Sequence, residues 1–492
     1  MLIPRPRVSE LGVVVALWGI PVLLALLSVG GQAVQAAATA AGALSIGVAL
    51  FRPVHGLAAL PFLALLSPVA GYVGGGEAAF VLSDLLVLVL AAQLLVRVAV
   101  TIQRPRVALP SPQLVLLLLT GLGCTVGVVW GTLTTLKPLL YVVQLGVVYW
   151  YTVEHATTEA EWSLVVSSWL AAATLASLLV VRAYLSGVDL SAWAQSSQPV
   201  ITDRAQLTVL FRARHYYAGF HHVLGMSIVI ACLKVVFAQE ATARWWNGAM
   251  LLVMLACLLA MLNMTSVLSV VVSLVILLAL LPPRPSRRAL RYAAVALGAL
   301  VVVAVAVGGR LGAAVLGAAQ FELFVGRAVS ASTLLVRLQV YRAAVAAWLS
   351  HPVQVLFGMG PDFLVNSGAP SLSAAFKTSV ATGLVEGTVD SGWLSYLIEL
   401  GVIPVVLVVW LGIKVLGTLV HALRKSEGAD AVVVYVCGGL LFFSVSTLTQ
   451  VVGYGKVAWA ALQLFGIGVA YIRAARERGG PVALSAQASP SA

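Results

Sequence analysis

Long apolar runs follow one another through most of this chain and constrain its fold more than any other feature. About fourteen of them are long enough, or nearly so, to cross a bilayer as helices. The chain is 61% hydrophobic and 9% charged, whereas a soluble domain carries about 25% charged residues. Because no soluble core could bury so much apolar surface, we expect an all-α fold, a polytopic membrane helix bundle of about 12–14 transmembrane helices.

The first apolar run, 11–29, follows Arg5 and Arg7 as in a signal peptide. Its length and the runs behind it favour an uncleaved first helix. Prolines 61 and 68 leave open that two of the first four runs form a short re-entrant pair. The other spans are expected at about 33–51, 56–73, 80–100, 113–131, 138–153, 162–182, 220–238, 247–263, 266–281, 291–308, 393–413, 431–449 and 456–472.

These spans divide the chain into four parts. Residues 1–308 hold the first eleven predicted helices, with an outer loop at about 183–219. Residues 309–392 are expected to form a large outer loop that contains interfacial helices. Residues 393–478 carry the C-terminal transmembrane helices, and the small polar tail 479–492 is expected to be disordered.

Lysine and arginine predict the orientation of the bundle. With the N-terminus inside, 18 of the 29 basic residues fall in inner segments, and most of these segments are short loops. Both termini are then cytoplasmic, and the net charge of +12 reflects membrane anchoring rather than nucleic-acid binding. Nine of the remaining basic residues lie in or beside the two long outer loops, where orientation does not explain them.

The first outer loop ends in a dense polar and aromatic cluster between Arg212 and His222. Tyrosine, histidine and arginine could all lie at the level of the lipid headgroups, which explains the tyrosines well. That interpretation explains the arginines and histidines less well, so we treat Arg212 and Arg214 as candidate ligand-binding residues, with His221 and His222 as candidate acid–base groups.

In the second outer loop, a helix is expected from about 330 to 350. Arg337 and Arg342 flank its apolar stripe, so the helix suits the plane of the membrane interface. Both arginines could bind lipid headgroups, or they could bind the phosphates of an anionic lipid substrate at the same depth.

Glycines and carboxylates mark the rest of this loop. Gly358 and Gly360 would allow backbone N–H groups to converge on an anion, although such a pair is more often only a turn. Asp390 and Glu399 lie at the mouth of the next span, and a carboxylate there is costly unless it is paired or functional. We favour a structural hydrogen bond for Glu399, and Asp84 is a similar case.

Three segments resemble the bacterial O-antigen ligase and polymerase superfamily of integral-membrane glycosyltransferases. The resemblance extends over the whole topology, and its motifs occupy about a third of the chain. The matching segments are Arg337 with Trp348, His351-Pro352 and Gly358-Met359-Gly360-Pro361-Asp362-Phe363; Asp390-Ser391-Gly392-Trp393-Leu394 with Glu399-Leu400-Gly401; and Arg214 with Gly219-Phe220-His221-His222. Asp390 stands where ligases have a histidine, which favours a polymerase without excluding a ligase that uses Asp390 as the base.

The resemblance implies a GT-C-like fold and a polyprenyl-diphosphate-linked glycan as substrate, presented on the outer leaflet of a bacterial inner membrane. A sugar hydroxyl would attack the anomeric carbon with inversion, and arginines would stabilise the leaving diphosphate. Asp390, Arg337 and Arg214 would be catalytic. The implied diphosphate ligands are Arg212, Arg214, Arg337 and Arg342, and the implied sugar-stacking residues are Trp193, Tyr216, Tyr217 and Trp393.

No metal or other cofactor is predicted. The chain contains no Asp-x-Asp motif, and its four cysteines lie in apolar runs without metal-ligand spacing. Two other functions stay open beside the ligase: a transporter or flippase of lipid-linked glycans, and a membrane scaffold whose outer loop binds a partner. A transporter usually shows mid-span charges and two matching halves, and neither is evident here. A chain-length regulator is a candidate partner.

Overall fold

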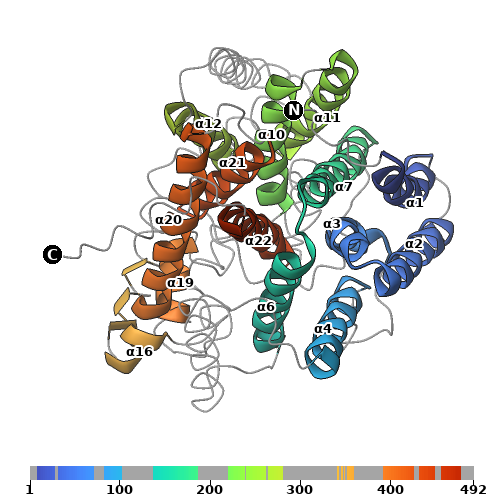
Figure 1. Ribbon diagram of the computed structural model, residues 1–492. Helices are drawn as coiled ribbons and strands as arrows, with labels where there is room; N and C mark the ends of the chain where they lie inside the picture. Colours follow the sequence, from blue (N-terminus) through green and yellow to red (C-terminus); the bar gives the residue numbers. More distant parts are fainter. Residues whose placement is uncertain are drawn as a thin grey trace.

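A computed structural model shows an assembly of packed helices (Figure 1). It describes six helical positions between 341 and 349, together with residues 8–27, 31–70, 82–101, 137–186, 220–238, 240–261, 264–280, 352–358, 392–425, 431–448 and 456–477. Every regular element in these ranges is a helix, which confirms the predicted all-α class. The predicted spans at 113–131 and 291–308 and the tail 479–492 lie outside the described residues.

The helices follow the predicted apolar runs closely. In chain order they are α1 Val8–Leu26, α2 Gly31–Phe51, α3 Pro53–Ala70, α4 Leu82–Thr101, α6 Lys137–His155, α7 Glu159–Ser186, α10 Phe220–Phe237, α11 Ala241–Met261, α12 Met264–Leu280, α16 Pro352–Phe357, α19 Gly392–Leu400, α20 Val402–Lys425, α21 Ala431–Ser446 and α22 Lys456–Glu477. Within the described residues, five helices are long and apolar enough to cross a membrane, and five more are apolar but shorter. The protein is therefore a multi-pass membrane protein.

The ends of the described helices form two groups, one at each end of the bundle. We call these the His222 end and the Lys234 end, after residues near the two ends of α10. The contacts that define the His222 end are His222–Ser446, Trp393–Thr447, Gln144–Asp84 and Arg182–Ala25. The contacts that define the Lys234 end are Lys234–Ser167, Arg97–Glu154, Arg424–Leu280 and Trp162–Tyr471. Most basic residues on the described helices lie at the Lys234 end, as expected for its predicted inner position.

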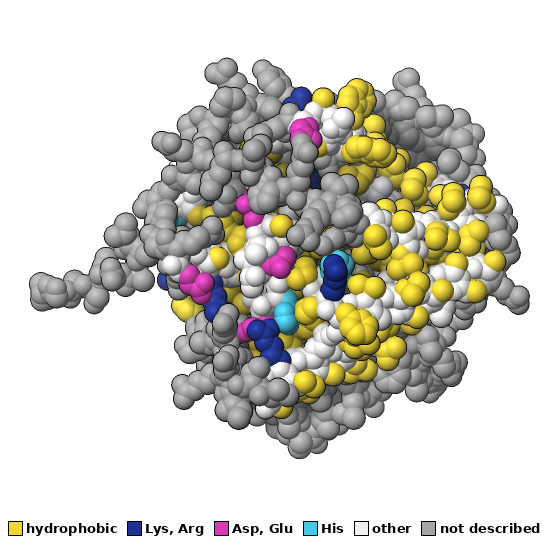
Figure 2. Space-filling view, turned by 45° about the vertical axis from the view of Figure 1, so that its right-hand side comes forward, with side chains coloured by type: hydrophobic (Ala, Val, Ile, Leu, Met, Phe, Trp, Pro, Cys, Tyr) yellow, Lys and Arg dark blue, Asp and Glu magenta, His cyan; other side chains and the backbone are white. Residues whose placement is uncertain are grey.

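The surface over α1, α2 and α4 is mainly hydrophobic, and the charged side chains of the view gather away from it (Figure 2). Large apolar side chains are exposed here, with Phe51 at 85% and Leu95 at 70%. A patch of this kind on a bundle of apolar helices is expected to face lipid.

The structure corrects one predicted boundary. The span expected at 393–413 is two helices, α19 and α20, because Gly401 between them has a φ of +84°, outside the helical range. The re-entrant pair among the first four runs stays a prediction, and α2 and α3 are helices of 21 and 18 residues. Helix α3 continues through both Pro61 and Pro68.

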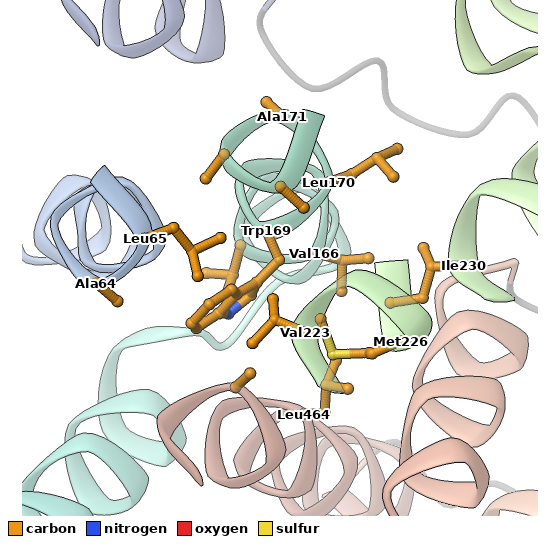
Figure 3. Close-up of a cluster of buried hydrophobic side chains, with 14 of the residues drawn as sticks. Ala64, Leu65, Val166, Trp169, Leu170, Ala171, Val223, Met226, Ile230 and Leu464 are labelled. Atoms are coloured by element: carbon orange, nitrogen blue, oxygen red, sulfur yellow. The ribbon is translucent and has the colours of Figure 1, made fainter. Parts of the chain in front are cut away.

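A buried polar link explains how α3 accommodates Pro61. A proline has no N–H, so the Leu57 carbonyl four residues earlier lacks its usual helical donor. Gln463 of α22 donates to that carbonyl through Nε2 at 3.3 Å, and its Oε1 accepts a hydrogen bond of 2.6 Å from Trp169 Nε1 of α7. Figure 3 shows Trp169 pointing between Leu65 and Leu464. The link therefore joins three helices at the centre of the bundle.

Replacing Gln463 by leucine is expected to lower the free energy of unfolding by about 1–2 kcal/mol, because Trp169 Nε1 and the Leu57 carbonyl each lose their partner. Thermal unfolding in detergent measures the change. The double variant with Trp169→Phe should cost less than the sum of the two single variants, since one variant already removes the other's partner. An unchanged melting temperature for Gln463→Leu would contradict this explanation of the link.

Candidate functional site

The start of α10 is fastened to the end of α21 at the His222 end. His222 is fully buried, and its Nδ1 shares a hydrogen bond of 2.6 Å with Ser446 Oγ. The two helices approach closely at Gly225, which has no side chain. A Cβ there would overlap the ring of Phe442. The rings of His221 and His222 lie 4.1 Å apart between centroids. The chain that leaves the first outer loop therefore enters the bundle at a defined place.

The start of α19 is fastened to the same turn of α21. The Trp393 amide donates to the Thr447 carbonyl at 3.3 Å, and its indole Nε1 lies 3.5 Å from the Ser444 carbonyl. Trp393 is thus attached one residue away from the partner of His222. Asp390 precedes Trp393 by three residues, and Arg214 precedes His222 by eight. The chain that leaves each candidate loop is therefore attached to one of two consecutive residues, Ser446 and Thr447.

Two glycines lock α16 against the junction of α19 and α20. Gly358, directly after α16, has a φ of +81°, and a Cβ there would overlap the carbonyl of Glu399. A Cβ at Gly401 would overlap the amide nitrogen of Gly358 and the carbonyl of Leu356. Both positions thus require glycine for its φ and for this close backbone contact. In the structure, Gly358 takes part in packing, whereas Gly360 of the expected anion-binding turn lies outside the described residues.

Replacing Gly401 by alanine is expected to destabilise the protein by at least about 1–3 kcal/mol, because a side chain is strained at this φ, before any backbone displacement. Gly412→Ala in α20 is the matched control. A Cβ there meets nothing within 4 Å, and alanine favours helix over glycine. Melting temperatures of both variants in detergent measure the difference. Equal melting temperatures would show that the contact with Gly358 does not constrain this junction.

One side of α19 carries an aromatic and acidic group. Trp393 and Tyr396 make an edge-to-face contact with centroids 6.3 Å apart, and Glu399 is 6% exposed. The burial of Glu399 suits the structural role that we favoured for it.

The described residues include four of the predicted site residues. His221 and His222 lie on the first turn of α10, Trp393 lies half-buried on α19, and Arg342 is exposed at a helical position. Arg342 is not connected to the other three by any contact described above. The other predicted site residues, Trp193, Arg212, Arg214, Tyr216, Tyr217, Arg337 and Asp390, lie outside the described residues.

One feature of this end was not assigned from the sequence. Ser446 and Thr447 join the loop ends, and their only signal in the sequence is a run of hydroxyl residues where an apolar run finishes. Asp84, singled out as a costly carboxylate, has a structural explanation, because its Oδ1 accepts a hydrogen bond of 3.2 Å from Gln144 Nε2.

A comparison with protein families matches residues 249–411 to the family described as O-Antigen ligase. The matched segment runs from α11 through α12, α16 and α19 into α20, and it includes Arg337, Gly358, Asp390 and Gly401. The match covers about a third of the chain and supports the O-antigen ligase and polymerase superfamily. No curated protein matches the chain in a sequence search.

The match confirms the resemblance found in the motifs and supports a ligase- or polymerase-type function. Both interlocked glycines, 43 residues apart in the chain, lie in the matched segment and touch each other in the folded protein. The first-loop cluster and the end of α21 lie outside the matched residues.

Proposed function

We propose that this member of the O-antigen ligase and polymerase superfamily polymerises lipid-linked oligosaccharide repeat units. It transfers a glycan from polyprenyl diphosphate to a sugar hydroxyl on a second lipid-linked glycan, with inversion. One observation carries the proposal: His222 and Trp393, which close the two loops that hold the outer cations, are attached to the consecutive residues Ser446 and Thr447. A donor and an acceptor bound by the two loops would then meet at this end of the bundle.

The reaction needs a proton acceptor and a stabilised leaving group. The acceptor hydroxyl attacks the anomeric carbon, the bond from that carbon to the diphosphate oxygen breaks, and the hydroxyl proton passes to Asp390. The diphosphate departs with additional negative charge. Arg212, Arg214, Arg337 and Arg342 are our candidates to stabilise this charge, because guanidinium groups stay protonated and bind phosphate oxygens in pairs. The mechanism assigns no step to a metal ion.

The aromatic residues would position the sugars. Trp393 is half-buried at the start of α19, and its ring packs edge-on to Tyr396, so it offers a fixed platform for a sugar face. Trp193, Tyr216 and Tyr217 are the other candidates for stacking. His221 remains a candidate acid–base group, whereas the complete burial of His222 suits a supporting role.

Purified protein in detergent or nanodiscs, supplied with a polyprenyl-diphosphate-linked repeat unit, tests the proposal. A ladder of products that differ by one repeat is expected from a polymerase. A single transfer, seen only when another acceptor is added, would identify a ligase instead, the activity that the matching family's description names. Absence of both products would favour transport or docking.

The proposal includes a location. The Lys234 end, rich in lysine and arginine, would face the cytoplasm, and the His222 end would face the outer side of a bacterial inner membrane. Both termini are then cytoplasmic. Cysteine accessibility in intact cells tests this orientation: residues introduced beside Trp393 should react with an impermeant reagent, and residues beside Arg424 should not. A chain-length regulator would meet the protein on its outer side.

A further inference from the structure

Ser446 ends α21 and Thr447 follows it, and nothing above places either residue in the reaction. We propose that Ser446 is a positioning residue which, with the Thr447 carbonyl, fixes the separation between the ends of the two outer loops. This inference rests on the proposed function. Ser446 is fully buried, and its hydroxyl meets His222 Nδ1 at 2.6 Å, while the next residue accepts the hydrogen bond from the Trp393 amide at 3.3 Å.

The burial of His222 and Ser446 indicates that they position other groups and do not contact the substrate. His222 and Ser446 are both 0% exposed, so neither side chain can touch a glycan without leaving its place. Their hydrogen bond instead fixes the His222 ring, which packs against the half-buried ring of His221, 4.1 Å away. The influence of Ser446 on the reaction therefore passes through His222 and the chain that precedes it.

The proposed role of Ser446 is to keep the distance between the ends of the two outer loops constant. The first loop contains Arg212 and Arg214, and the second contains Asp390. Within the described residues, the chain that follows each of these loops is attached to Ser446 or Thr447. In enzymes, a displacement of about 1 Å between reacting groups can reduce the rate by about 100-fold. A short buried hydrogen bond at the junction is a direct way to prevent such a displacement.

Replacing Ser446 by alanine is expected to reduce kcat by about 10- to 100-fold with KM for the lipid-linked glycan within about twofold, because the groups that bind substrate are retained and only their spacing changes. Ser444→Ala is the matched control. Ser444 lies in the same helix, is exposed, and donates only to the Leu440 carbonyl of that helix. Wild-type kcat for Ser446→Ala, or an equal loss for Ser444→Ala, would overturn the proposal.

Two variants of His222 separate positioning from acid–base chemistry. An asparagine amide lies where Nδ1 of histidine lies and can keep the bond to Ser446, whereas a glutamine amide lies nearer to the place of Nε2. His222→Asn is expected to keep kcat within about threefold of wild type and His222→Gln to behave like Ser446→Ala. The reverse order would show that Nε2 of His222 takes part in the reaction and would overturn positioning. These variants also test the inference if Ser446→Ala does not fold.

Melting temperatures test the contact without any activity. The losses in Ser446→Ala and His222→Leu should not add in the double variant, because both remove the same hydrogen bond. Additive losses would overturn the inference whatever the enzyme does. Non-additive losses in a protein that transfers no glycan would leave the contact in place and refute the proposed function instead.

Discussion

Replacing Arg337 by alanine is expected to reduce glycan transfer by about 10²–10³-fold while the protein still folds and inserts. The reason is the loss of a fixed positive charge beside a diphosphate that gains negative charge as it leaves. The rate of repeat-unit transfer by purified protein measures the effect, and polymer length in cells carrying the variant reports it independently.

Two controls accompany the Arg337 variant. Arg337→Lys keeps a charge but loses the paired hydrogen bonds of a guanidinium group, so its activity should lie well below wild type. Arg244→Ala removes an exposed arginine at the Lys234 end, which donates to the Ala238 carbonyl, and should leave transfer unchanged. If Arg337→Lys were fully active, the residue would be a membrane anchor or part of a docking surface.

Replacing Asp390 by asparagine is expected to reduce transfer by about 10²–10⁴-fold, because an amide of the same shape cannot accept the hydroxyl proton. Binding of the lipid-linked donor should change little, so the loss should appear in kcat. The control is Asp84→Asn, which alters a carboxylate at the same end of the bundle whose structural partner is Gln144. Full activity of Asp390→Asn would remove this residue as the base.

The double variant of Arg337 and Asp390 tests whether the two residues act in the same step. An arginine that stabilises the leaving group and an aspartate that takes the proton act in the same transition state. The double variant should therefore be little worse than the more damaging single one. Independent losses that multiply would indicate that one of the two residues acts in substrate binding.

Much of the fold could be predicted because it depends on local hydrophobicity. Runs such as 220–238 and 431–449 match α10 and α21 within a few residues, since a span must be apolar along its whole length. The accumulation of basic residues at one end also follows from the sequence alone. The break at Gly401 was missed, because hydropathy does not report the φ of a single residue.

The candidate site could be predicted only in part. Motifs identified the superfamily and pointed to the two loops, since residue types such as arginine are unusual on the outer side of a membrane. They gave no indication that Gly358 packs on Gly401 or that Ser446 holds His222. Both contacts join residues far apart in the chain, and small or hydroxyl residues are common in membrane helices without such roles.

The sequence by itself thus determined that this protein is a bundle of membrane helices, because lipid demands apolar spans, and it predicted the chemistry at one end from the distribution of charge. Only the tertiary structure decided which residues meet there. Ser446 lies 224 positions from His222, and Gln463 lies 406 positions from the Leu57 carbonyl that it serves. Such pairs are fixed by how whole helices pack against one another, and no local pattern of residues contains that information.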